Sequence, residues 1–245
     1  MPLTKVSLGS VVGKQYVYKL FSYADAIKSL IIVQLIAIAF SFLGSMGGGT
    51  GNGQVNIWVS YYSIDIVVVF TMLWVFTTAI LLTSKAYRYE DYSFVTNRLS
   101  SQLSNIAFLL TAAMTGTITA ILSGYFIFLI THLRNVPMLN STAAVGSLSE
   151  IVLATCGAFL YLVLVGAFGY FVGACAQISK LFILIFPAVF FVISIVFESS
   201  FIVEQFFQFY FMEKSIWIFG VKVLVTSVAL YGIALMIFSK REVRL

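Results

Sequence analysis

The sequence predicts an all-α membrane protein with six transmembrane helices, and two observations carry that prediction. The first is composition: of 245 residues, 61% are hydrophobic and only 9% are charged, whereas soluble domains carry roughly 25% charged residues. The second is spacing, because the charges stand mainly in short gaps between apolar runs of about the length that a membrane-crossing helix needs. The net charge of +5 does not indicate nucleic-acid binding, since Lys and Arg form no polar face.

Six apolar runs supply the predicted spans. In chain order they are Ser29–Met46, Trp58–Ser84, Asn105–Ile130, Ile151–Val172, Leu181–Phe197 and Ile216–Phe238. None shows the strict alternation of apolar and polar residues that a membrane β-strand requires. The segment before the first run is polar, bears lysines and shows no small-residue cleavage site, so the first run is predicted to be a retained span.

Basic residues predict that both termini lie in the cytoplasm. With the N-terminus inside, eleven of the fourteen Lys and Arg residues fall on the inner side, which is the side they prefer. They are Lys5, Lys14, Lys19, Lys28, Lys85, Arg88, Arg98, Lys180, Lys240, Arg241 and Arg244. The outer side then carries Arg134 and Lys214. The expected location is a cell membrane that the chain crosses several times.

Three connecting segments have distinct compositions. The run Gly47–Gly53, GGGTGNG, predicts a flexible outer turn without an apolar anchor. The N-terminal segment 1–28 has aromatic residues beside lysines, which favours an interfacial helix on the inner leaflet; a solvated tail is the alternative. The segment 198–214, ESSFIVEQFFQFYFMEK, is too polar to span and is predicted to lie in the interface or to re-enter the membrane.

The residues that catalysis or metal binding would need are not in suitable positions. The nearest match to a phosphate-binding loop is Gly9–Gln15, GSVVGKQ, which is one residue short and ends in the wrong residue. The single histidine, His132, is predicted in an outer loop, so neither a Ser–His pair nor a zinc site is expected. We therefore expect no enzymatic activity and no cofactor in this chain.

Two charged residues lie within predicted spans. Asp65 in the second span and Lys222 in the sixth are each roughly 10 Å from the outer end at 1.5 Å per residue. An unpaired charge in lipid costs at least about 2.5–3.5 kcal/mol, so we predict an intramembrane ion pair between them. Two alternatives stay open. Lys222 reaches the outer interface while Asp65 faces water, or Lys222 meets Glu204 or Glu213 instead.

The longest inner loop, residues 85–104, is the candidate for contact with a soluble partner. Its segment Tyr92–Gln102 mixes apolar with polar residues and predicts a short amphipathic helix, with a solvated connection as the alternative. Within it, Glu90 is followed by the run SFVTNR over Ser93–Arg98.

With this loop and topology, the chain resembles the type-2 ABC exporter permeases. Those proteins have about six spans, both termini inside, an N-terminal interfacial helix and a first cytoplasmic coupling helix that often reads E…SLPVSR. The present sequence lacks the family's frequent proline between Phe94 and Val95. The resemblance implies that Glu90, Phe94, Val95 and Arg98 contact a separate ABC ATPase, which would bind ATP and magnesium.

The resemblance also implies an assembly and a substrate class. The whole chain, 1–245, would be one permease domain that forms a homodimer or a heterodimer with a related permease. The substrate would be an amphipathic peptide or a lipid-like molecule, as in compact bacterial permeases for peptide export or resistance. The alternative function is a non-transporting membrane protein, either an immunity factor that sequesters a peptide or an assembly scaffold.

Small residues in the fourth span favour close helix packing. Gly157, Gly166, Gly169 and Gly173 would allow another helix to approach closely. The partner is either a helix of a second copy or a helix of the same chain.

The predicted topology is tested by labelling. Single cysteines or reporter fusions at Gly51 and Asn140 should report the outside, and those at Glu90 and Lys240 the inside, because the basic residues set this orientation. Inversion of any one of these four positions would contradict the six-span model.

Overall fold

The computed structural model describes most of the chain. The described residues are 7–43, 46–51, 56–61, 64–85, 87, 98–133, 147–179, 181–182, 185, 188, 205, 208–210, 212–213 and 215–239. Among them, five helices are long and apolar enough to cross a membrane: Ala24–Leu43, Asp65–Leu82, Leu99–Leu133, Leu148–Ala176 and Ile216–Ser239. By length and composition they support a membrane protein, and each overlaps one of the predicted spans. The predicted span Leu181–Phe197 lies largely outside the described residues.

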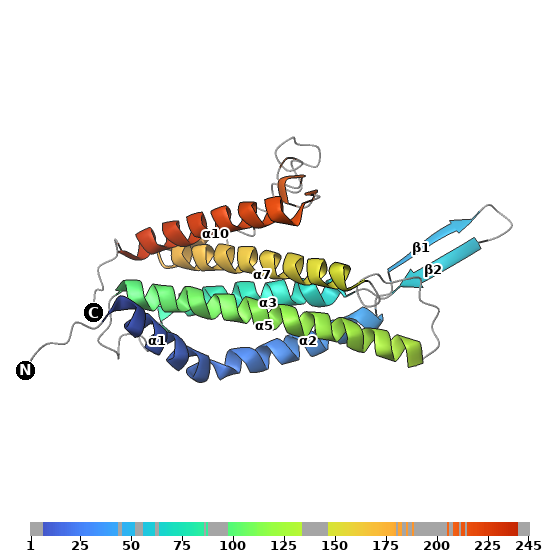
Figure 1. The fold of residues 1–245 in the computed structure, drawn as a ribbon, viewed down its shortest axis with the longest axis horizontal. Coiled ribbons are helices and arrows are strands. Elements are labelled where there is room, and N and C mark those ends of the chain that lie inside the picture. The colour runs from blue at the N-terminus through green and yellow to red at the C-terminus, as the bar shows by residue number, and fades with distance from the viewer. Residues whose placement is uncertain are drawn as a thin grey trace, which may run out of the picture.

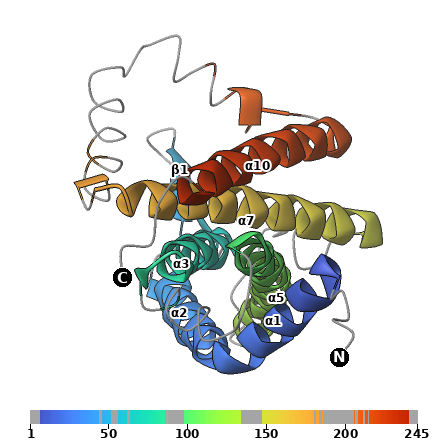
Figure 2. The same cartoon turned by 90° about the vertical axis from the view of Figure 1, so that its left-hand side faces the viewer.

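The helices form an elongated bundle (Figure 1). The elements are α1 (Leu8–Ser22), α2 (Ala24–Leu43), β1 (Met46–Gly51), β2 (Asn56–Tyr61), α3 (Asp65–Leu82), α5 (Arg98–Leu133), α7 (Leu148–Ala176) and α10 (Ile216–Ser239). Viewed along the bundle, α7 and α10 lie across a group formed by α1, α2, α3 and α5 (Figure 2).

The ends of the helices define two ends of the bundle. Helices α1 and α5 begin at one end of the bundle, and α10 ends there; this end is here called the α1 end (Figure 1). Helix α7 also ends there, whereas α10 begins at the opposite end (Figure 1). Helices α7 and α10 therefore run in the same direction along the bundle (Figure 1).

A β-hairpin replaces the predicted flexible turn. Strands β1 and β2 pair antiparallel, from Met46 opposite Tyr61 to Gly51 opposite Asn56, and project beyond the bundle (Figure 1). The prediction of a flexible turn is therefore wrong over Gly47–Gly51, and Gly53 lies outside the described residues. The prediction that the second span starts at Trp58 is also wrong, since that helix begins at Asp65. Glycine accepts extended backbone when a partner strand pairs with it, and NIWVSY is rich in strand-forming residues.

Glycines on α7 let it approach α3 closely. An ideal Cβ built on Gly169 would lie 2.7 Å from the carbonyl oxygen of Phe76, and one on Gly173 would lie 3.1 Å from the Cα of Ile80. A Cβ on Gly166 would lie 3.0 Å from a methyl group of Val75. Three of the four glycines predicted to favour close approach thus serve packing inside this chain.

The outward surface of the helices is apolar. Along α10 the exposed large apolar side chains are Trp217, Ile218, Val221, Leu224, Val225, Val228, Ile233 and Met236. Helix α1 buries Gln15 and Lys19 while Phe21 is 79% exposed and Lys14 stays exposed. Such a helix, with an exposed aromatic residue beside an exposed lysine, is suited to a membrane interface.

The glycine contact predicts a position-specific effect on stability. Gly169→Ala should lower the thermal unfolding temperature in detergent, because the new methyl group meets the Phe76 carbonyl at 2.7 Å and overpacking costs about 1–3 kcal/mol. The matched control is Gly232→Ala on α10, where nothing lies within 4 Å of the added Cβ. Similar unfolding temperatures for the two variants would contradict this account of the α3–α7 contact.

Candidate functional site

A fully buried lysine joins α1 to the first turns of α5. Lys19 has 0% exposed surface. Its Nζ donates a hydrogen bond to the carbonyl oxygen of Ser101 at 3.3 Å and another to Oδ1 of Asn105. An ammonium group removed from water needs such acceptors, because burial of a cation without them is very unfavourable. These bonds therefore fix α1 against α5.

The hydrogen-bond network continues into α7. Asn105 Nδ2 donates to the hydroxyl of Tyr170 at 3.4 Å, and that hydroxyl donates to Oε1 of Gln102. Tyr170 is fully buried. The four side chains of Lys19, Gln102, Asn105 and Tyr170, here called the Lys19 network, thus connect three helices.

Aromatic side chains surround the Lys19 network. The Tyr170 ring packs against Tyr231 of α10 with ring centroids 5.6 Å apart. On the α1 side, the Tyr23 ring makes edge contacts with Phe108 at 5.7 Å and with Tyr87 at 4.7 Å. These aromatic rings lower the local dielectric constant around the polar groups. A low dielectric constant strengthens the hydrogen bonds that form and makes a buried polar group without a partner costly.

The network lies at the α1 end of the bundle. Figure 2 looks at that end and shows α1 lying against α5, with α7 running across the view above α5. Arg98 is the first residue of α5, so the segment that precedes α5 joins the bundle less than two turns before Asn105.

The sequence-predicted coupling residues are only partly within the described structure. Glu90, Phe94 and Val95 lie outside the described residues, as does the side chain of Arg98. The end of the predicted amphipathic segment differs from the expectation. Residues 98–102 belong to the long helix α5, and Gln102 is buried instead of facing water.

Lys222 has a different partner from the one predicted. Its Nζ lies 3.0 Å from Oε1 of Glu213, whereas Asp65 is the exposed first residue of α3. The predicted Asp65–Lys222 pair is therefore wrong, and the structure shows the Glu213 alternative. Glu213 belongs to the segment just before α10, so a short chain closure brings it to Lys222 at little entropic cost.

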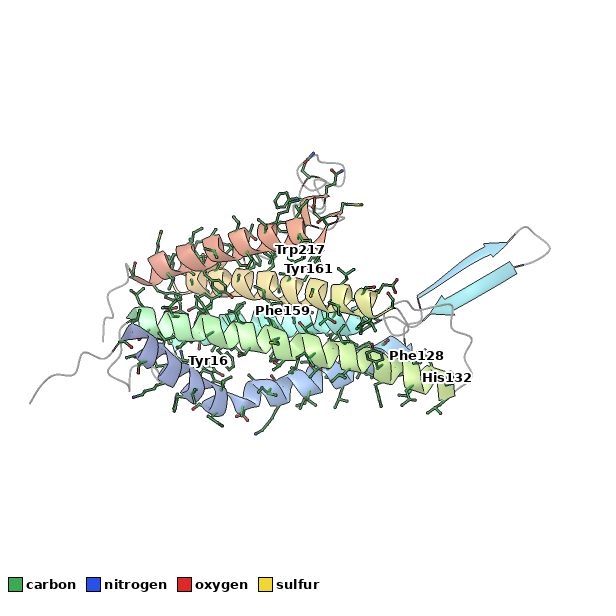
Figure 3. The ribbon with its side chains drawn as sticks, viewed as in Figure 1. Tyr16, Phe128, His132, Phe159, Tyr161 and Trp217 are labelled. Atoms are coloured by element: carbon green, nitrogen blue, oxygen red, sulfur yellow. The ribbon has the colours of Figure 1, made fainter. Side chains whose placement is uncertain are left out.

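His132 lies at the exposed end of α5. It lies in the last turn of α5, not in a loop as predicted, and stacks on Phe128 with ring centroids 6.1 Å apart (Figure 3). Within the described part of the chain, no three His, Cys, Asp or Glu residues are grouped in a way that could hold a metal ion.

Sequence reasoning missed the burial of Lys19. It treated this lysine as one of several inner-side basic residues of an interfacial helix. The available signal was on the other helix, where Ser100, Ser101, Gln102, Ser104 and Asn105 precede a long apolar run. Polar residues so close to a span call for a partner inside the protein.

The Lys19–Asn105 bond predicts non-additive stability effects. Lys19→Met and Asn105→Leu should each lower the unfolding temperature in detergent, because each leaves a buried polar group with fewer partners. The double variant should lose less free energy of unfolding than the two single losses added together. The difference should be about 0.5–3 kcal/mol, as for other residues in contact. Strictly additive losses would show that the two side chains are not energetically coupled. Thr115→Val, which removes an exposed hydroxyl bonded within its own helix, serves as the control.

The resemblance to type-2 ABC exporter permeases therefore depends on the topology and on the inner-loop residues. Comparison of the chain with family models, curated proteins and solved structures finds no match.

Proposed function

We propose that this chain is the membrane subunit of an ABC exporter that takes its energy from a separate ATPase. Its substrate would be an amphipathic peptide or a lipid-like molecule. The observation that supports this proposal best is the Lys19 network, which ties three helices together where the inner loop joins α5. A membrane subunit driven from outside needs such a junction, because force on one loop has to move several helices together.

Transmission through the bundle follows from the contacts. Force on the inner loop enters at Arg98 and moves the first turns of α5. The buried bonds of Lys19 and Tyr170 make α1 and α7 follow α5. Because α7 packs on α3 at glycine contact distance, α3 moves with α7. The helices α1, α3, α5 and α7 would then move together between two arrangements of the bundle. ATP binding to the partner could favour one of these arrangements over the other.

The substrate pathway is proposed to lie between two copies, or between this chain and a related permease. Inside one chain, the close α3–α7 contact allows little separation without loss of packing. The apolar outward faces of α2 and α10 would meet lipid or the second subunit.

A membrane immunity factor that sequesters a peptide is the competing function. It would share the membrane topology but would need no ATPase. The two functions are separated by asking whether an ABC ATPase copurifies with the chain and whether the chain alone hydrolyses ATP. We expect no hydrolysis by the chain alone, since its sequence contains no complete phosphate-binding loop.

The coupling assignment is tested at Phe94. Phe94→Asp should reduce the yield of the ATPase complex at least tenfold, because a carboxylate replaces the apolar side chain proposed to enter the partner surface. The amount of permease in the membrane should be unchanged, and Phe94→Leu should keep the complex. Pull-down and substrate-stimulated ATP hydrolysis are the measurements. Wild-type complex yield together with wild-type stimulated hydrolysis in Phe94→Asp would rule out this contact.

A further inference from the structure

The segment before α10 folds back onto α7 and α10. Tyr210 is only 9% exposed and packs in a cluster with Phe219 and Val223 of α10. Tyr161 of α7 contributes to the same cluster, and its ring lies 4.7 Å from that of Phe219. Figure 3 labels Tyr161 near Trp217, at the end of the bundle where α10 begins.

Two side chains hold consecutive backbone carbonyls of this segment. The Tyr161 hydroxyl donates to the carbonyl oxygen of Tyr210 at 2.9 Å. Lys222 Nζ donates to the carbonyl oxygen of Phe209 at 3.2 Å. Both donors bond to backbone carbonyl oxygens and not to side chains. They would therefore bond equally to another peptide that presents two carbonyls in this arrangement.

Lys222 also recognises side chains of the segment. Its ammonium lies 4.0 Å from the centre of the Phe209 ring and 3.0 Å from Oε1 of Glu213. The Lys222 and Glu213 side chains are 20% and 25% exposed. The ion pair is therefore partly shielded from water, where it is stronger than at a wet surface, whereas the Phe209 ring is 44% exposed.

We propose that Tyr161, Phe219, Lys222 and Val223, here called the tyrosine–lysine patch, form a peptide-docking site. Its resident occupant is the chain's own segment before α10, which is helical over residues 208–210 and places Glu213 beside Lys222. The patch would accept a separate peptide with two adjacent aromatic residues and an acidic residue three positions after the second, in the same turn conformation. An aromatic anchor in an apolar pocket, donors to backbone carbonyls and one cation are the components of peptide-recognition sites. The proposal does not rest on the exporter assignment, because docking needs no ATPase.

The tether explains why a free peptide would compete poorly with the resident segment. A segment joined to its site by a short chain acts at an effective concentration in the millimolar range. The resident segment therefore has to be weakened before the patch can be titrated with a peptide in solution.

The test uses the full-length chain in detergent and a fluorescein-labelled peptide QFYFME, which copies residues 208–213. Binding is measured by fluorescence polarisation. The variant Phe209→Ser/Tyr210→Ser should bind the peptide at least tenfold more tightly than the unchanged chain. Adding Lys222→Met should weaken that binding at least tenfold. Adding Thr226→Val instead should leave it unchanged, since the Thr226 hydroxyl bonds within α10.

A second variant covers the case in which the double serine variant fails to fold. Glu213→Lys places a like charge beside Lys222 and should release the segment while leaving the patch intact, so peptide binding should again exceed that of the unchanged chain. The proposal is overturned if folded variants bind QFYFME no better than a scrambled peptide. It is equally overturned if Lys222→Met leaves binding unaltered, because the patch would then only pack its own segment.

Discussion

Burial of the Lys19 ammonium is the constraint on which the arrangement at the α1 end depends. A cation without contact with water needs oxygen acceptors at fixed positions. Those acceptors are the Ser101 carbonyl and the Asn105 amide of α5. Helix α1 therefore cannot turn about its axis or slide along α5 without losing them. Asn105 is positioned in turn by Tyr170 of α7, so one charge sets the relative placement of three helices.

The same rule applies through the middle of the bundle, where the polar groups are neutral. The Gln34 amide of α2 donates to the Thr71 hydroxyl at 3.1 Å and to the Gly116 carbonyl at 3.3 Å. It thereby links α2 to α3 and α5 inside the apolar region. Threonine hydroxyls along α5 bond to carbonyls of their own helix. Lipid offers no hydrogen bonds, so each of these groups has to find its partner within the protein.

The two kinds of helix contact have different mechanical consequences. Helices α3 and α7 meet through glycines at van der Waals distance, which resists separation because any gap forfeits many short contacts. Helices α1 and α5 meet at Lys19 through directional bonds, which transmit displacement only while their geometry is kept. At the opposite end, Lys222 holds the segment before α10 by an ion pair, a carbonyl bond and a ring contact.

The sequence by itself determined that the chain holds five long apolar helices of the kind that cross a membrane, although it placed the start of the second one too early. Hydropathy is a local property, and a helix satisfies its backbone within a single run of apolar residues. The sequence did not determine the partner of Lys222, the burial of Lys19 or the pairing of Gly47–Gly51 with residues 56–60. Only the tertiary structure decided these, because each depends on which groups from distant parts of the chain come into contact. Asp65 and Glu213 are equally acidic, and only the fold brings Glu213 to within 3.0 Å of the lysine.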